Sequence, residues 1–525
     1  MRTRSTSQRN LSGSTRTARD VLRRRGGRQL VAALAIAGGV FGAASEAQAA
    51  DVTRVATAFE DDNVFDVHLG VAYDFNYKRA AILREWNSGR PGDNENRLVK
   101  DLIYEQFRHT LTPTLEFGLF RDLGLYFELP IVLSDSRQYS FDQRADDCVF
   151  GSPGGSPVAS CTNKANSSTL RDEILPTSGF DATNTGNPSL PFGGPDSELI
   201  FKGPVRRGLD QLNIGLKYAL LNQDKRSHMP TWLIAFEGRF AVGRAMTFSR
   251  DIQGREPDGN TRVGRRIHEL GVWTALSRRY RFLDPYFTAH WRQSLRASGS
   301  IFRDFSSEGS QDSVLPQSQA GLTVGTEIVP WERRAKNLKV AVVLQGSSVL
   351  HYGGRGYSEI WELLADSPSM VGSYDPTTQA VDDNGDPTNP GFCDRGAALA
   401  YAQQNPGDPG YLAAGGSGCQ KFEGVTNLQD YASFGFTGGL NLTLGKVAHV
   451  GLGVTANTDT RHFITAAGRG DADLSGSGGS NPEEVEAGTR EVNPIRRDVV
   501  DNVGRRYAVD DVFDMHAYLR LTLVF

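Results

Sequence analysis

Charged side chains interrupt several apolar segments of the 525-residue chain, and they are the residues best suited to take part in binding or chemistry. They fall at alternating positions, opposite apolar neighbours, so they would share the inner face of any closed structure that the segments build. The candidates are Glu116, Glu128, Lys217, Glu237, Arg239, Arg292, Glu327 and Arg520. Charges enclosed at bilayer depth must be paired or hydrated. We therefore expect these residues to line a lumen, either as a structural network of ion pairs and water or as a polar path for a solute.

Covalent chemistry is not indicated by the other reactive residues. The chain has nine His, none set in a recognisable Ser or Asp constellation, and no G-x-S-x-G nucleophile motif. The sequence therefore predicts a protein that is not an enzyme and needs no cofactor.

One acidic segment resembles a calcium loop. Oxygen ligands crowd around Gly385 in Asp382–Asp386, but the twelfth position from Asp382 is Cys393, where an EF-hand requires Glu. The surrounding segment, 349–430, holds 11 acids and 3 bases. Calcium binding and a solvated acidic loop both remain open, and we assign no metal site.

The four cysteines form two local pairs in Gly/Pro/Ser-rich stretches. Three pairings are formally possible, and proximity in the sequence favours Cys148 with Cys161 and Cys393 with Cys419. We expect both bridges to staple loops, which implies an oxidising compartment.

The first 49 residues have the three parts of a secretory signal peptide. Nine Arg precede the apolar run Leu30–Ala44, and an A-x-A site ends at Ala49. Removing residues 1–49 takes away nine bases and two acids, which changes the net charge from -4 to -11. The mature protein is therefore expected to be acidic and exported.

Composition excludes two broad classes of protein. The longest uncharged apolar run has 15 residues, too few for a membrane-spanning helix, so a polytopic helical membrane protein is excluded. A net charge of -4 excludes a strongly basic nucleic-acid binder, so we expect no nucleic-acid partner.

The elements that would position the charged residues are long strands. Residues 65–77 alternate apolar and polar side chains through thirteen positions, whereas globular strands usually have about five or six residues. The same pattern recurs in 103–119, 124–135, 210–221, 231–243, 266–277, 285–295, 318–329, 338–348, 431–444, 449–458 and 512–525. The count is twelve, an even number.

The connections alternate in length. Short links at 120–123, 222–230, 278–284, 330–337 and 445–448 alternate with long ones at 78–102, 136–209, 244–265, 296–317, 349–430 and 459–511. Short turns at one end and long loops at the other are typical of an outer-membrane β-barrel. A soluble periplasmic β-sandwich also has alternating strands, but its strands are shorter and its loops are not segregated by length. The fold expected is therefore all-β: a single antiparallel transmembrane barrel of about twelve strands, with short periplasmic turns and long extracellular loops.

Three segments follow from this interpretation: residues 1–49 as signal peptide, 50–63 as a periplasmic N-terminal leader that could enter the lumen as a plug, and 64–525 as barrel. The expected location is the outer membrane of a Gram-negative bacterium, with the lipid bilayer as a partner.

The C-terminus carries a more specific pattern. Apolar residues occupy every second position from Phe513 and end on the terminal aromatic Phe525. This resembles the C-terminal signature of bacterial outer-membrane barrels. The resemblance implies that the barrel-assembly machinery reads Phe525.

A second resemblance rests on the segments GLDQLNIGLKYALL at 208–221, PTWLIAF at 230–236, LGLYFELP at 123–130 and DPYF at 284–287. Together they are similar to a family of outer-membrane barrels associated with meta-cleavage phenol degradation and regarded as transporters. These barrels are distant relatives of the fatty-acid-transporting barrels. The chain departs from the family with Ala241-Val242-Gly243, where Pro-Thr-Gly is expected, and with longer outer loops.

The expected function is a channel or transporter-like barrel that passes a small solute, with an apolar solute among the candidates. The alternative is a surface scaffold with a closed lumen whose disulfide-stapled loops bind a ligand.

Overall fold

The structure is a computed structural model that describes residues 50–60, 63–86, 97–141, 167–175, 199–223, 225–249, 259–302, 310–371, 393–405, 408–416, 419–472, 474, 483–486 and 491–525. Residues 1–49, Cys148, Cys161 and Asp382–Asp386 lie outside the described residues, so the signal peptide, the first cysteine pair and the acidic segment stay predictions. No helix in the described part of the chain is long and apolar enough to cross a membrane.

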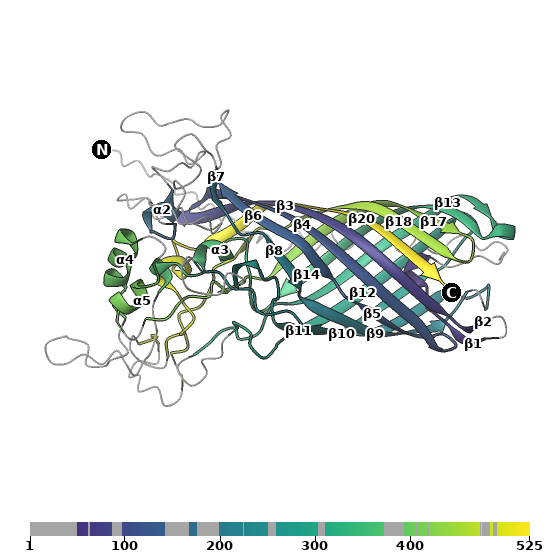
Figure 1. Cartoon of the computed structure of the whole chain (residues 1–525), viewed down its shortest axis with the longest axis horizontal. Coiled ribbons are helices and arrows are strands. Elements are labelled where there is room, and N and C mark those ends of the chain that lie inside the picture. The colour runs from purple at the N-terminus through teal and green to yellow at the C-terminus, as the bar shows by residue number, and fades with distance from the viewer. Residues whose placement is uncertain are drawn as a thin grey trace, which may run out of the picture. The chain divides into compact units, whose positions relative to one another are not determined.

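The strands form one closed antiparallel barrel, seen from the side in Figure 1. Its wall consists of β3 (Val67–Trp86), β4 (Arg97–Phe120), β5 (Leu123–Glu128) with β6 (Ile131–Ser140), β8 (Arg206–Leu209) with β9 (Gln211–Leu221), β10 (Thr231–Ala241), β11 (Ile267–Ser277), β12 (Leu283–Arg296), β13 (Ser318–Arg333), β14 (Leu338–Tyr352), β17 (Tyr431–Leu444), β18 (Ala448–Asp459) and β20 (Tyr507–Val524). Sequential neighbours pair throughout. The predicted antiparallel barrel of twelve strands is confirmed.

Closure comes from pairing between the last strand and the first. β20 pairs with β3 over a long register that runs from Tyr507 opposite Arg84 to Val524 opposite His68. The terminal Phe525 extends this seam, because its backbone N–H donates to the Val67 carbonyl at 2.9 Å and its carbonyl accepts from the Val67 N–H at 3.1 Å. No edge strand is left in the wall, as a lipid environment requires.

Two neighbouring strands are interrupted at the same height. The third breaks between β5 and β6 at Leu129 and Pro130, because proline has no N–H to donate to the ladder. The fourth breaks between β8 and β9 at Asp210, whose carboxylate accepts from the backbone N–H of Arg265 at 2.7 Å and from its side chain. Each broken pair still crosses the barrel as one strand of the twelve.

The first long connection, expected at 78–102, is mostly strand. β3 continues to residue 86 and β4 begins at residue 97. The expectation was wrong because Ala80 and Ile82 pack into the core above the barrel while Ala81 and Leu83 are buried on the opposite face. Burial on both faces removes the alternation of polar and apolar residues that marks a strand.

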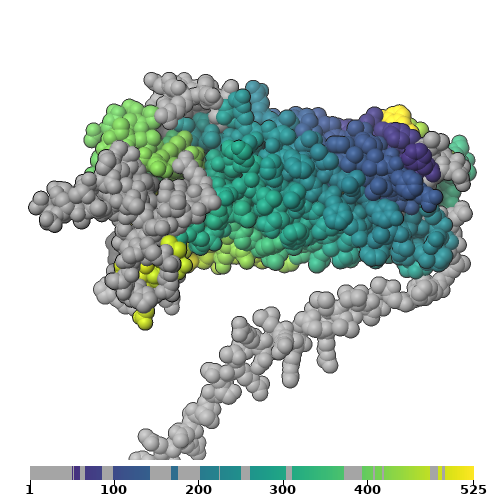
Figure 2. All heavy atoms as spheres, turned by 90° about the horizontal axis from the view of Figure 1, so that it is seen from below, coloured from purple at the N-terminus to yellow at the C-terminus, as the bar shows by residue number. Residues whose placement is uncertain are grey.

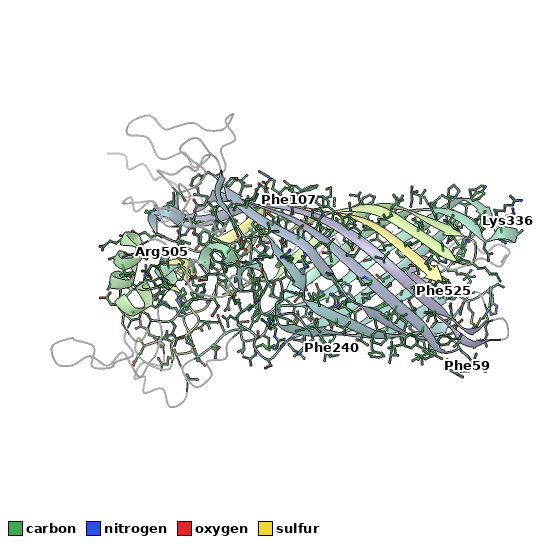
Figure 3. The ribbon with its side chains drawn as sticks, viewed as in Figure 1. Phe59, Phe107, Phe240, Lys336, Arg505 and Phe525 are labelled. Carbon is green, nitrogen blue, oxygen red and sulfur yellow. A yellow bond between two sulfur atoms is a disulfide. The ribbon has the colours of Figure 1, made fainter. Side chains whose placement is uncertain are left out.

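The outward positions carry apolar side chains that are exposed in the isolated chain. Examples are Phe236, Phe434 and Phe436, each at least 50% exposed, and Figure 3 shows Phe107 and Phe240 on the barrel's outer side. Trp232, Trp291 and Trp331 are also exposed. The wall visible in the space-filling view is made of consecutive strands and forms a broad surface for acyl chains (Figure 2).

The long connections contain short elements that gather at one end of the barrel, which we call the cap (Figure 1). They are β7 (Leu199–Lys202), β15 (Arg355–Gly356), β16 (Thr426–Asn427), β19 (His462–Phe463), α2 (Ser168–Arg171), α3 (Trp361–Leu364), α4 (Arg395–Gln404), α5 (Tyr411–Ala414), α6 (Asp498–Asp501), η5 (Gly259–Thr261) and η7 (Pro368–Met370). The opposite end carries η2 (Asp51–Thr53), β1 (Ala58–Glu60), β2 (Asn63–Phe65) and the short turn η6 (Arg334–Lys336). Figure 3 labels Arg505 at the cap end and Lys336 at the short-turn end.

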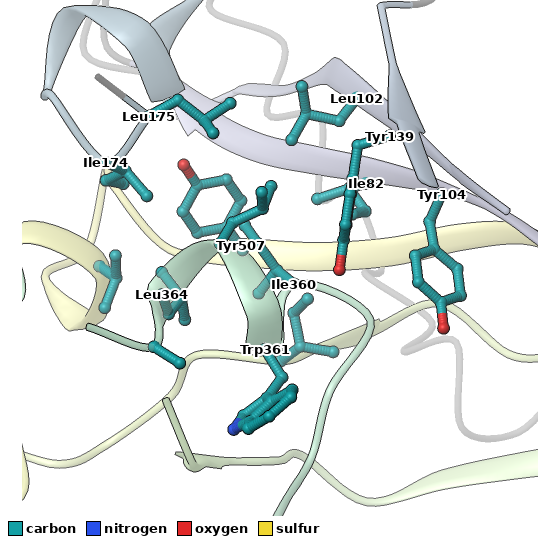
Figure 4. Packing of buried hydrophobic residues seen from close by; sticks show 14 of the residues in the cluster. Ile82, Leu102, Tyr104, Tyr139, Ile174, Leu175, Ile360, Trp361, Leu364 and Tyr507 are labelled. Atoms are coloured by element: carbon teal, nitrogen blue, oxygen red, sulfur yellow. The ribbon is translucent and has the colours of Figure 1, made fainter. Parts of the chain in front are cut away.

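The cap has its own hydrophobic core. Ile360, Trp361 and Leu364 of the α3 region pack against Tyr139 of β6 and Tyr507 of β20, all nearly fully buried (Figure 4). A smaller cluster joins Ala398 of α4 to Tyr411 of α5, and Cys393–Cys419 closes a disulfide beside it. The second predicted disulfide is therefore confirmed.

Candidate functional site

The inward faces of the strands carry the charged residues that the sequence singled out. Glu116 of β4 and Lys217 of β9 form an ion pair at 2.8 Å across the lumen wall. Glu128 of β5 accepts a hydrogen bond of 3.2 Å from the side-chain amide of Asn213. Glu128 is therefore partnered from the neighbouring strand, and Glu116 is partnered across β5 from the next strand but one.

Glu237, Arg239 and Arg292 form one cluster. Glu237 accepts from Arg239 at 2.5 Å and from the Tyr126 hydroxyl at 2.6 Å, and the Arg292 guanidinium lies 3.9 Å from the same carboxylate. Arg239 also approaches Glu269 at 3.7 Å. The structure thus brings these three predicted residues together as an ion-pair network on the β10–β12 side of the wall.

Glu327 and Arg520 differ in their surroundings. Glu327 is 2% exposed and pairs with Lys339 at 3.2 Å, so this charge is enclosed. Arg520 is exposed towards the lumen, and its guanidinium carbon lies 4.8 Å from the centre of the Tyr518 ring. Of the eight candidates, Arg520 is the one that presents its charge most openly.

The N-terminal leader lies against the inner wall. The Thr53 hydroxyl is 2.8 Å from the Ser277 hydroxyl of β11, and Val55 packs against Leu233 and Ala235 of β10. The backbone N–H of Ala56 donates to Glu116 at 3.0 Å. The leader therefore lies against β4, β10 and β11 at the short-turn end of the lumen.

Gly118 of β4 makes this docking possible. A Cβ at this position would collide with the Thr57 carbonyl of the leader, so the wall needs a residue without a side chain where the leader backbone passes.

A cavity of about 520 Å³ remains on the other side of the lumen. Its lining comes from the leader, through Val52 and Arg54, and mainly from strands β13, β14, β17, β18, β20 and β3. Most of the lining residues are polar or charged, and they include Lys217, Glu327 and Arg520 from the sequence prediction. The leader therefore occupies part of the lower lumen, and a polar space remains beside it.

Charged side chains and stacked rings lie together near the cap end of the inner wall. Lys78 pairs with Glu359 at 2.7 Å and with Asp459 at 3.6 Å. Tyr431 is sandwiched between His351 and His462, with ring centroids 4.4 Å and 3.8 Å apart. These contacts connect strands β3, β14, β17 and β18 to the cap, which contributes Glu359 and His462.

Above these contacts, the cap contains one fully buried ion pair. Arg206 and Glu362 are 2.8 Å apart, and both side chains are 0% exposed. The Arg206 guanidinium also stacks on Trp361, 5.0 Å from the ring centroid. Gly203 lies against the Glu362 carboxylate so closely that a Cβ there would collide with it. The ion pair, the Trp361 ring and the backbone at Gly203 are therefore closely packed at the cap end of the barrel.

The sequence prediction missed the cap residues Arg206, Trp361 and Glu362. They lie outside the alternating segments from which lumen residues were chosen. A usable signal existed, because four apolar residues surround Glu362 in Ile360–Leu364, within a polar, Gly-rich stretch, and such a cluster is typical of a buried element.

One acid in the cap, Asp501, has a raised pKa. Burial raises the pKa of Asp501 in α6 to about 6, although the backbone N–H groups of Arg497 and Ala467 donate to it. Desolvation of the carboxylate outweighs these hydrogen bonds.

Metal-binding geometry was not found among the residues that the structure describes. No three His, Cys, Asp or Glu side chains converge there as ligands.

Comparison with known proteins yields structural likeness alone. No family model matches the chain, and no curated protein matches it. Similar solved structures include the COG4313 outer membrane channel from Pseudomonas putida F1, at 8% identity over 87% of this chain and 96% of that chain with a TM-score of 0.29. A FadL homologue from Pseudomonas aeruginosa is 8% identical over 88% and 90%, with a TM-score of 0.27, and the outer membrane protease OmpT from Escherichia coli is 6% identical over 88% and 97%, with a TM-score of 0.24. At these scores no residue role is carried over to this chain.

The closed wall, the exposed apolar belt and the polar lumen define the class on their own. The protein is a closed antiparallel β-barrel of the class that crosses a membrane with its strands.

Proposed function

We propose that this barrel passes a small polar solute across the outer membrane and that the cap is its gate. The observation that carries the proposal is the cavity of about 520 Å³ beside the leader, because a barrel filled only for stability would pack that space with side chains. Its lining is mostly polar, which favours a polar solute over the apolar one that the family resemblance raised.

The position of the closure supports a gated path. The cavity lies beside the leader, whereas Arg206, Trp361 and Glu362 are fully buried at the cap end and would form the seal. Passage of a solute therefore requires the cap to move. The α4–α5 lobe, which the disulfide closes, forms a cluster separate from that central seal.

The test is conductance of the full mature chain in planar bilayers, together with solute-dependent swelling of proteoliposomes. Glu362→Gln removes one charge of the seal, so we expect more frequent or larger current steps than in the wild type. Asp498→Asn is the matched control, because that carboxylate is 71% exposed on the cap surface and should leave the current unchanged.

The packed cap also favours the second candidate, a surface scaffold with a closed lumen. Absence of current and of swelling for both the wild type and Glu362→Gln, with the barrel shown to be folded, would support the scaffold and overturn the proposed passage.

A further inference from the structure

The lower cavity has an uneven charge distribution. Its charged lining residues are Arg54, Lys217, Lys339 and Arg520, with Asp74 and Glu327 as the acids. The Lys339–Glu327 pair is almost fully buried at 3.2 Å, and Lys217 is held by Glu116 at 2.8 Å. Arg520 and Asp74 are the charged lining residues for which no such close ion pair holds the side chain.

Arg520 is the most exposed of the four cations that line this space. It is exposed, and among the residues that the structure describes no carboxylate lies within 4.0 Å of its guanidinium. Asp74 attracts it electrostatically from two positions away along the neighbouring strand without forming an ion pair. The Tyr518 ring, 4.8 Å away, supports one face of the guanidinium and leaves its edge for a ligand.

The neighbouring strands leave room in front of this group. Arg520 is paired with Gly451 of β18 on one side and with Ala72 of β3 on the other, and both residues are small. Hydroxyl groups of Thr455 and Thr522 line the same cavity. A guanidinium presents a planar fork of N–H donors that matches a carboxylate, and hydroxyl groups can complete the hydrogen bonds of its oxygens.

We propose that this cavity is a binding site for small solutes that carry a carboxylate, with Arg520 as the anchoring charge. The inference rests on the proposed passage of a polar solute and specifies its chemical class. Arg54 of the leader adds a second positive group to the lining, so the leader forms part of the site as well as part of the wall.

The test measures binding separately from passage. Succinate is titrated calorimetrically into the full mature chain in detergent micelles, with 1,4-butanediol as the uncharged probe of the same length. We expect succinate to bind and butanediol not to bind. Arg520→Gln should weaken succinate binding at least about tenfold, the effect of losing a charge-assisted hydrogen bond.

Two further variants make the result specific. Arg520→Lys keeps the charge but loses the fork, so its affinity should fall between those of the wild type and Arg520→Gln. Arg226→Gln removes an exposed arginine in the turn between β9 and β10 and should bind succinate as the wild type does. Barrel folding of each variant is checked by heat-modifiable gel mobility.

The possible outcomes separate the two proposals. Equal binding of succinate by the wild type and Arg520→Gln, binding of inorganic phosphate as tight as that of succinate, or no succinate binding at all would each overturn the carboxylate site. Swelling with neutral solutes would then still support the proposed passage. Succinate binding that depends on Arg520 but is accompanied by no swelling in any variant would keep the site and overturn the passage.

Discussion

At the scale of single residues, the most constrained group is the Arg206–Glu362 pair. Two charges with no exposed surface are stable only because each compensates the other and because Arg206 also donates to the backbone carbonyls of Thr247 and Arg262. Removal of one partner therefore costs far more than removal of both.

Glu362→Gln should destabilise the closed cap by about 3–5 kcal/mol, because it leaves the Arg206 charge buried without a counter-charge. Faster hydrogen exchange in the α3 segment would show this. The double variant Arg206→Met, Glu362→Leu removes both charges and should restore most of the protection. Exchange in Glu362→Gln that matches the wild type would contradict this account.

The raised pKa of Asp501 predicts how the stability of the cap depends on pH. Its carboxyl binds a proton more tightly in the folded cap than in the unfolded chain, because burial raises the pKa to about 6. The contribution to stability is therefore full below about pH 4 and is lost as the pH rises to about 6, at about 1.4 kcal/mol per pH unit.

Hydrogen exchange in residues 495–505, corrected for the intrinsic exchange rate, should accordingly show stronger protection at pH 4.5 than at pH 6.5. Asp501→Asn cannot titrate and should remove this difference. A pH dependence that survives in Asp501→Asn would assign it to another group.

At the scale of elements, the leader and the α4–α5 lobe each depend on one local feature. The leader passes over Gly118 because no side chain is there, and the lobe is closed by Cys393–Cys419 around a small cluster separate from the main cap core.

Gly118→Ala should displace the leader from the wall, since the new methyl group would collide with the Thr57 carbonyl. Single-channel conductance of the open state should then increase, because the leader no longer occupies its part of the lumen. Gly438→Ala is the control, since a Cβ there meets no atom within 4 Å. Unchanged conductance in Gly118→Ala would show that the leader does not limit the path.

Cys393→Ser with Cys419→Ser should open the lobe while leaving the barrel intact. A bridge that spans 26 residues removes about 3–4 kcal/mol of chain entropy from the open state of that loop. Limited proteolysis should therefore cut between residues 393 and 419 in the double variant and in the reduced wild type, but not in the oxidised wild type. Resistance of the double variant would mean that packing of Ala398 and Tyr411 suffices.

At the scale of the whole molecule, closure depends on the β3–β20 seam. Phe525 ends that seam with two backbone hydrogen bonds to Val67, and its ring is 64% exposed towards the lipid side. Its predicted role as an assembly signal is consistent with this place, since a free aromatic ring at the last strand is accessible before the barrel closes.

Deletion of Phe525 should lower the fraction of folded barrel in outer membranes, because it removes both seam hydrogen bonds and the terminal aromatic side chain. Heat-modifiable gel mobility measures that fraction. Phe525→Tyr keeps the ring and the backbone and should assemble normally. Normal assembly of the deletion variant would refute the terminal signal.

Much of the barrel follows from the sequence alone. The twelve strands, the two classes of connection and the Cys393–Cys419 bridge could be predicted because they depend on local order: a strand with one face to lipid and one to the lumen alternates at every second residue, whatever its partners are. The same alternation identified Glu116, Lys217 and Arg520 as residues of the polar face.

Only the tertiary structure decided which of these charges are compensated and where the lumen is closed. Lys217 and Arg520 look alike in the sequence, yet one is held by Glu116 of a strand about a hundred residues earlier and the other reaches into a cavity. The cap likewise joins Arg206 to Glu362 and Tyr139 to Tyr507 from segments far apart in the sequence. Such contacts depend on which segments lie side by side in the folded chain. The periodic pattern of one segment contains no information about its tertiary partners.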